Sequence, residues 1–150
     1  MSDIDDGVRF VIPGKAQPER KRQVSRGKWT RRVDTKPAAE FKAKCALFAA
    51  RAMGGRAPFD EPLVGVITWR TRKPSGYRKH EYYPHKRPDL DNLCKSLMDG
   101  ITGVVMTDDA KFVTLCLNKE FGDRDEVEVV VTLADPEYPY RRDDAANGTA

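Results

Sequence analysis

Four acidic side chains and one lysine are spaced so that they could bind a metal ion and a phosphate group. Asp89 and Asp91 stand two positions apart, and Lys95 follows Asp91 at the spacing of one helical turn. Asp108 and Asp109 form a second acidic pair further along the chain. Mg²⁺ prefers oxygen ligands, usually keeps several waters and often binds substrate phosphates. A bound Mg²⁺ lowers the pKa of a water and offsets charge on a scissile phosphate, so the pattern favours phosphodiester hydrolysis.

In this scheme Asp89, Asp91 and Asp109 hold the metal, and Lys95 acts on the same phosphate as a point charge. Each residue also has a purely structural interpretation. Asp89 could cap a helix, and Asp91 with Lys95 could form an ordinary ion pair one turn apart. Asp108 and Asp109 could be turn formers or caps of a short helix. Carboxylates this close repel one another, and that repulsion is a physical reason to expect a cation.

Positive charge is concentrated in two segments. Residues 15–32 contain eight Lys or Arg and one Glu, and residues 70–87 contain seven and one. The rest of the chain has 12 basic and 21 acidic residues, although the net charge is only +4. This distribution favours a polyanionic partner over scattered, solvated loop charge. The candidate DNA contacts in these segments are Lys15, Arg20, Lys21, Arg22, Lys86 and Arg87.

Aromatic residues lie among these charges. Trp29 belongs to the first basic segment, and Tyr77, Tyr82 and Tyr83 belong to the second. They could stack on unpaired bases, or the tyrosines could pack on a sheet instead.

The hydrophobic pattern predicts the elements that must position these residues. Strands are expected at 8–12, 63–69, 112–121 and 126–131, with Val113, Leu115 and Leu117 on one face of the third. A helix should begin after Asp34 or Thr35 and end at Gly54, and a second should run from Pro88-Asp89 to near Gly103. Residues 15–32 and 70–88 are expected to be loops. The prediction is an α+β, two-layer β-α-β-α-β-β domain whose four-stranded mixed sheet packs with two amphipathic helices.

The second helix has the clearest pattern. One apolar stripe contains Leu90, Leu93, Cys94, Leu97, Met98 and Ile101. Asp91, Lys95 and Asp99 fall on the opposite face, so we expect them to face solvent or a ligand.

The remaining features of the sequence limit the class of protein. We expect residues 1–134 to form a single domain and residues 135–150 to form a loose tail. No apolar run is long enough for a membrane helix, and no signal peptide is visible, so a cytoplasmic protein is expected. Cys45, Cys94 and Cys116 are predicted to be buried small hydrophobes rather than zinc ligands. Nothing indicates a small organic cofactor or a membrane partner.

The acidic segment has a familiar form. The stretch from Arg87 to Gly100, RPDLDNLCKSLMDG, followed by TDDA at residues 107–110, resembles the RusA family of Holliday junction resolvases. The stretch FVIPGK at residues 10–15, and Lys119 on the strand after the Asp-Asp turn, resemble the family too. The resemblance covers roughly residues 8–133.

The resemblance implies a homodimer that binds a four-way DNA junction and makes paired, symmetry-related nicks in recombination and repair. It implies dependence on Mg²⁺, for which Mn²⁺ can substitute. The essential carboxylates of the family match Asp89, Asp91 and Asp109, and its essential lysine matches Lys95. Lys119 joins the expected DNA contacts, and an origin in a phage or prophage is consistent with the resemblance.

Three other classes stay open. A non-catalytic nucleic-acid-binding module would explain the basic segments but not the crowded carboxylates. A metal-dependent nuclease acting on flaps or other branched or single-stranded DNA would share the site. An interaction protein of a phage assembly would show no metal response and no preference for branched DNA.

Overall fold

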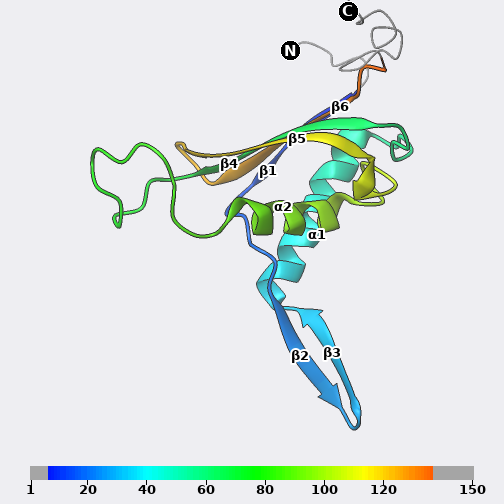
Figure 1. The fold of residues 1–150 in the computed structure, drawn as a ribbon, viewed down its shortest axis with the longest axis horizontal. Helices are drawn as coiled ribbons and strands as arrows, with labels where there is room; N and C mark the ends of the chain where they lie inside the picture. The colour runs from blue at the N-terminus through cyan, green and yellow to red at the C-terminus, as the bar shows by residue number, and fades with distance from the viewer. Residues whose placement is uncertain (1–6, 137–150) are drawn as a thin grey trace, which may run out of the picture.

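A four-stranded sheet and two helices form two layers in the computed structural model, which describes residues 7–136 (Figure 1). The strands of the sheet are β1 (Gly7–Pro13), β4 (Leu63–Thr71), β5 (Phe112–Phe121) and β6 (Glu126–Leu133). Helices α1 (Lys36–Met53) and α2 (Leu90–Ile101) both lie against one face of it, and the short 3₁₀ helix η1 (Asp109–Lys111) precedes β5. The predicted α+β class, mixed sheet and two helices are confirmed.

The order of the strands across the sheet is β1-β6-β4-β5. The pairs β1/β6 and β6/β4 are antiparallel, whereas β4/β5 is parallel. A parallel pair needs a long crossover connection. Here the connection consists of the loop after β4, helix α2 and η1, so both predicted acidic segments belong to this one connection.

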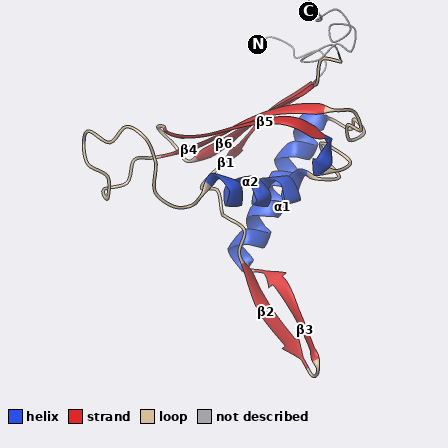
Figure 2. Ribbon diagram, in the orientation of Figure 1, coloured by secondary structure: helices blue, strands red, loops and turns tan. Residues whose placement is uncertain are grey.

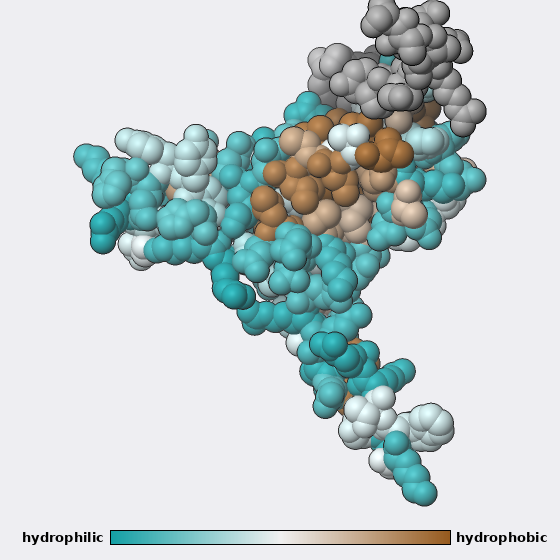
Figure 3. All heavy atoms as spheres, in the orientation of Figure 1, coloured by the Kyte–Doolittle hydropathy of each residue, from teal (hydrophilic) through white to brown (hydrophobic). Residues whose placement is uncertain are grey.

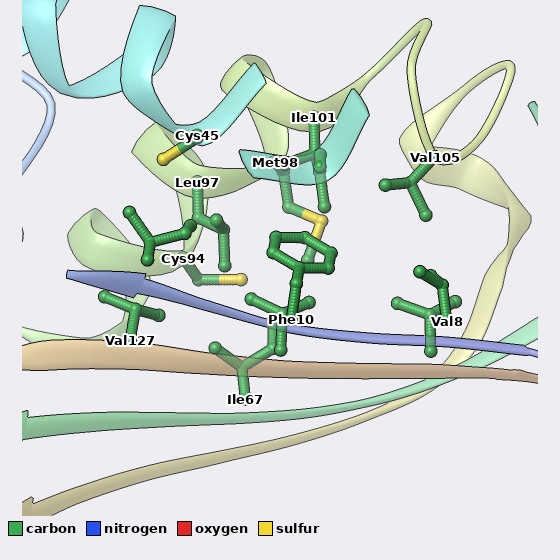
Figure 4. Close-up of a cluster of buried hydrophobic side chains, with 14 of the residues drawn as sticks. Val8, Phe10, Cys45, Ile67, Cys94, Leu97, Met98, Ile101, Val105 and Val127 are labelled. Atoms are coloured by element: carbon green, nitrogen blue, oxygen red, sulfur yellow. The ribbon is translucent and has the colours of Figure 1, made fainter. Parts of the chain in front are cut away.

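The core lies between the sheet and the helices (Figure 4). Alternate residues of β1 and β6 point into it, and the α2 stripe is buried as predicted, with Leu90 partly covered. Cys45 and Cys94 are buried, but Cys116 is exposed, which corrects the prediction for that cysteine. It pairs with Val66 on the face of the sheet that neither helix covers.

The predicted common face of Val113, Leu115 and Leu117 is interrupted. The β4/β5 register shifts between Leu63 and Val64, which pair with Phe112 and Thr114, so Val113 is a bulge residue. Its side chain is 64% exposed. Leu115 and Leu117 pair with Gly65 and Ile67 on the helix-facing side.

Most of the first basic segment is not a loop, which corrects the predicted order of elements. β2 (Lys21–Arg26) and β3 (Trp29–Asp34) form a separate two-stranded antiparallel sheet that projects from the body (Figures 1 and 2). Gly27, with φ 61°, is the first residue of the two-residue turn between Arg26 and Trp29. Glycine is favoured there because hairpin turns need a positive φ that L residues rarely adopt. The hairpin buries no apolar face, so the alternation that reveals a half-buried strand is missing from its sequence.

The second basic segment does form a loop, which leaves the end of β4 and returns at α2 (Figure 2). Hydrophilic residues cover most of this loop and of the hairpin, whereas hydrophobic residues gather on the body (Figure 3). Neither helix in residues 7–136 has the length and hydropathy needed to cross a bilayer. Of the predicted tail at residues 135–150, the part after Pro136 lies outside the described residues.

Candidate active site and nucleic-acid interface

Asp89 and Asp91 stand at the start of α2 with their carboxylates exposed. Asp89 occupies the N-cap position, but its side chain accepts no capping hydrogen bond. Within residues 7–136, neither carboxylate forms an ion pair. A helix N-terminus favours nearby negative charge, so both carboxylates suit this position and remain open to a ligand.

The two members of the second acidic pair have different surroundings. The Asp108 carboxylate accepts a hydrogen bond of 2.8 Å from the backbone N–H of Ala110, so it caps η1. Asp109 lies exposed in η1, and its side chain makes no hydrogen bond to the described residues. Burial, together with the negative charges of Asp109 and Asp91, raises the pKa of the Cys94 thiol. Asp91 and Asp109 therefore both lie close enough to Cys94 to act on it.

The carboxylates do not form a closed cage. In the part of the chain that the structure describes, no three His, Cys, Asp or Glu side chains are grouped closely enough to hold a metal by themselves. The expected convergence is therefore looser than the sequence suggested. An open set of this kind still fits Mg²⁺, which is usually bound by one or two carboxylates, several waters and the phosphates of a substrate.

Lys95 does not pair with Asp91. Its Nζ lies 3.3 Å from Oε2 of Glu19, a carboxylate whose side chain is only 9% exposed. Nζ of Lys21 lies 3.2 Å from the other oxygen of Glu19. Burial opposes ionisation of Glu19, but the two lysines outweigh it and lower its pKa. Glu19 therefore fixes the position of Lys95 on the exposed face of α2.

Sequence reasoning missed Glu19, although it is the one acidic residue among the eight basic residues of 15–32. An isolated carboxylate in such a basic segment was the feature of the sequence that could have indicated its role.

The third polar residue on this face of α2, Asp99, has a structural partner. It binds Nζ of Lys42 at 3.1 Å, and the same Nζ lies 3.1 Å from Asp34, so the cluster ties α2 to α1.

Two of the expected DNA contacts hold the segment that leads into Asp89. Nζ of Lys119 donates to the carbonyl oxygens of Lys86 and Pro88, at 2.9 and 3.0 Å. Nζ of Lys86 donates to the carbonyl of Gly76 at 2.6 Å and lies 4.5 Å from the centre of the Tyr77 ring. Their ammonium groups therefore add positive charge beside the acidic site while fixing its backbone.

Within the described residues, the side chains of Arg87, Lys15, Arg20 and Arg22 form no hydrogen bond or ion pair, and all four are exposed. Arg70, by contrast, is fully engaged. Its guanidinium lies 2.6 Å from Glu120 and 2.9 Å from Glu128. The hydrogen bonds to Glu128 and Glu120 raise the pKa of the Arg70 guanidinium above its ordinary value. Its charge is therefore used within the sheet, unlike the charges of Arg87, Lys15, Arg20 and Arg22, which are exposed and unpaired among the described residues.

The aromatic residues of the second basic segment divide into two groups. Tyr77 packs edge-on against Phe121 and His85, with ring centroids 5.0 and 5.5 Å away. Tyr82 and Tyr83 are 76% and 73% exposed. Tyr77 thus packs on the sheet, one of the two roles considered from sequence, and the other two tyrosines point into solvent.

The hairpin has a distinct cationic face, which we call the arginine face. Paired residues share a side of a two-stranded sheet, and the register pairs Arg22 with Val33, Val24 with Arg31, and Arg26 with Trp29. Arg22, Arg26, Arg31 and Trp29 are therefore on one side, and Trp29 at the tip is 83% exposed. The sequence had placed these residues in a loop, where no shared face could be inferred.

Two comparisons with known proteins bear on this site. A protein-family profile described as endodeoxyribonuclease RusA matches residues 13–132, which include every acidic and basic residue discussed above. The chain is also 25% identical over 137 residues to a protein of Bacillus subtilis (strain 168) called "Uncharacterized protein YqaN". That alignment covers 84% of this chain and 96% of the Bacillus protein, so the two have similar extents.

Proposed function

This chain belongs to the RusA endodeoxyribonuclease family, and from that premise we propose that it resolves four-way DNA junctions by metal-dependent paired nicks. The observation that supports the proposal most directly is the set of carboxylates at Asp89, Asp91 and Asp109. They are exposed, have no cationic side-chain partner in residues 7–136, and lie beside surfaces rich in Lys and Arg. A non-catalytic DNA-binding surface gains nothing from uncompensated negative charge, because that charge repels the phosphates.

The proposed metal ligands are Asp89, Asp91 and Asp109, with Mg²⁺ as the ion and Mn²⁺ as a substitute. When bound, Mg²⁺ supplies a water of lowered pKa and offsets charge on the scissile phosphate. The chain's own residues then have separate tasks. Lys95, held by Glu19, presents an ammonium group to the same phosphate, and the backbone that carries Asp89 is fixed by Lys119.

We further propose that two copies act together. A four-way junction has near two-fold symmetry, and an isologous dimer matches it with two identical sites. The hairpins then provide two projecting cationic arms, one for each half of the junction. Their contacts with the phosphate backbone would select the branched shape rather than a base sequence.

The direct test is to incubate the purified protein with labelled four-way junction, linear duplex and flap DNA, in Mg²⁺ and in EDTA. We expect symmetry-related nicks in two strands of the junction, in Mg²⁺ only. Cleavage of the flap in preference to the junction would instead indicate a nuclease of other branched DNA. Junction binding without cleavage in either Mg²⁺ or Mn²⁺ would place the protein among non-catalytic binding modules.

Lys95 and Glu19 give a second prediction. Lys95→Ala should reduce the single-turnover rate by about 10²-fold or more, the scale of removing one preorganised charge contact from a transition state. Glu19→Gln keeps the size of the side chain but removes the charge that holds Lys95, so we expect a smaller reduction in the same rate. Lys21→Ala removes the other partner of Glu19 and also one expected DNA contact, so it controls for damage to this ion cluster when the rate is measured at saturating protein. An unchanged rate in Lys95→Ala would exclude Lys95 from the chemistry.

A further inference from the structure

A cavity of about 300 Å³ lies between the end of β4, the second basic loop and the start of α2. Trp69, Tyr77 and Leu93 are among its apolar lining residues, and Lys15, Arg87 and Lys119 are among its basic ones. Cavities that hold small ligands begin at about this size and are mostly apolar with a few placed polar groups. Arg87 and Pro88, which also line it, immediately precede Asp89, so the cavity adjoins the proposed active site.

One residue that lines the cavity, Trp69, has an unused hydrogen-bond donor. The side chain of Trp69 is 4% exposed, and its indole N–H has no acceptor among the described residues. Buried polar groups are almost always paired, and an exception in a native structure calls for an explanation such as a ligand. Because Trp69 lines the cavity, an oxygen or nitrogen acceptor on an occupant is a candidate partner for this N–H.

One lining residue of the cavity, Tyr77, is held firmly in place. Tyr77 is held by edge-on packing against Phe121 and His85, by the Lys86 ammonium over its ring, and by the hydrogen bond that its hydroxyl oxygen accepts from the Lys86 backbone N–H at 3.0 Å. A fixed aromatic ring in an apolar cavity suits a flat, polarisable ligand. The surrounding cations suit a ligand whose apolar part is joined to phosphates.

We propose that this cavity receives one unstacked nucleobase of the substrate DNA, next to the phosphate held at Asp89, and so sets the nucleotide preferred at the cleaved position. A nucleobase is flat, has acceptor atoms on its edge, and is flanked by phosphates that the basic residues around the cavity can contact. Bases at a branch point are the ones most easily unstacked, because they have lost a stacking neighbour. The inference rests on the proposed function because it takes branched DNA as the substrate, but it does not require that the DNA is cleaved.

The chain has two tryptophans, so a Trp29→Phe variant leaves Trp69 as the only indole fluorophore. This protein is titrated in EDTA with an intact four-way junction and with a junction whose nucleotides flanking the crossover are abasic. Gel shift measures binding of each junction independently. We expect both junctions to bind, and we expect a saturable loss of Trp69 emission with the intact junction only. Trp69→Phe, which removes the N–H but keeps an aromatic ring, should lower affinity for the intact junction and leave affinity for the abasic one unchanged.

Equal emission changes with the two junctions, or no change with a junction that binds, would overturn the proposal. If neither junction binds, a single-stranded tetranucleotide and its abasic analogue replace them, and no emission change with either would also overturn it. The proposed nuclease function fails separately, since it requires cleavage in Mg²⁺. A protein that shows the base-dependent emission loss but never cuts would retain the base-binding cavity and lose the enzymatic assignment.

Discussion

Replacing Asp91 by Asn is expected to abolish junction cleavage while junction binding is retained or strengthened. The substitution removes one proposed metal ligand and one negative charge, but it preserves the size and shape of the side chain. Removal of one electrostatic interaction with a transition state typically slows a reaction by about 10²–10³-fold, and removal of a metal ligand should do at least this. Binding should not suffer, because the removed charge repels phosphates. Single-turnover cleavage and gel shift, both on the same junction, measure the two effects.

Asp99→Asn is the matched control. It makes the same chemical change on the same face of α2, two turns further on, at a residue whose partner is Lys42. Cleavage by folded Asp99→Asn protein should stay within a few-fold of the parent. A parental cleavage rate in Asp91→Asn would refute the metal-site assignment, and equal losses in both variants would indicate a general effect of charge on α2. A second pair, Asp109→Asn and Asp108→Asn, distinguishes the proposed ligand from the residue that caps η1.

Reversing the charges of the arginine face should greatly weaken junction binding. In the triple variant Arg22→Glu, Arg26→Glu and Arg31→Glu, three attractive interactions with phosphates become repulsive. Removing one neutralised phosphate should reduce the slope of log affinity against log salt by about 0.9, so removing three should reduce it by about 2.7. Affinity at moderate salt should fall by at least about 10²-fold. Binding isotherms at four or more salt concentrations supply both quantities.

The opposite side of the hairpin provides the control. Gln23→Glu, Ser25→Glu and Thr30→Glu add three negative charges on that side and leave the arginines intact. This variant should bind more tightly than the triple arginine variant and retain most of the parental salt slope. If the salt slope is unchanged when the arginines are reversed, the hairpin does not contact DNA. The control changes the net charge by −3 and the arginine variant by −6, so a weakening about half as large on the logarithmic scale would mean that net charge, rather than the arginine face, attracts the junction.

Elements with a strong hydrophobic period could be predicted from the sequence. The α2 stripe determined which face of that helix is buried, and therefore that Asp91, Lys95 and Asp99 are exposed. The hairpin could not be found in the same way, because its residues bury no apolar side. Only the glycine of the Arg26-Gly27-Lys28-Trp29 turn, flanked by β-branched residues, indicated it.

The acidic residues were identified from spacing and from family resemblance, but their partners were not. Lys95 forms its ion pair with Glu19, 76 positions away in the chain, and not with Asp91, the partner that the purely structural interpretation allowed. Lys119 binds carbonyl oxygens of the segment before Asp89, and no side-chain pattern reveals such a contact. Long-range pairing of this kind depends on the topology of β4, α2 and β5, which local periodicity does not encode.

The two-stranded hairpin has a consequence for the behaviour of the protein in the absence of DNA. Within residues 7–136 no further strand pairs with either of its long edges, and an unpaired edge is a template on which another chain can add. The arginines and lysines along β2 and β3 prevent this addition by mutual repulsion between copies. The charges that we propose for DNA binding thus also keep the protein from self-assembling into extended sheets. Substitutions that neutralise the charges of the hairpin would therefore cause aggregation as well as weaker DNA binding. The charge reversals above keep charged side chains along both strands, so they would weaken DNA binding alone.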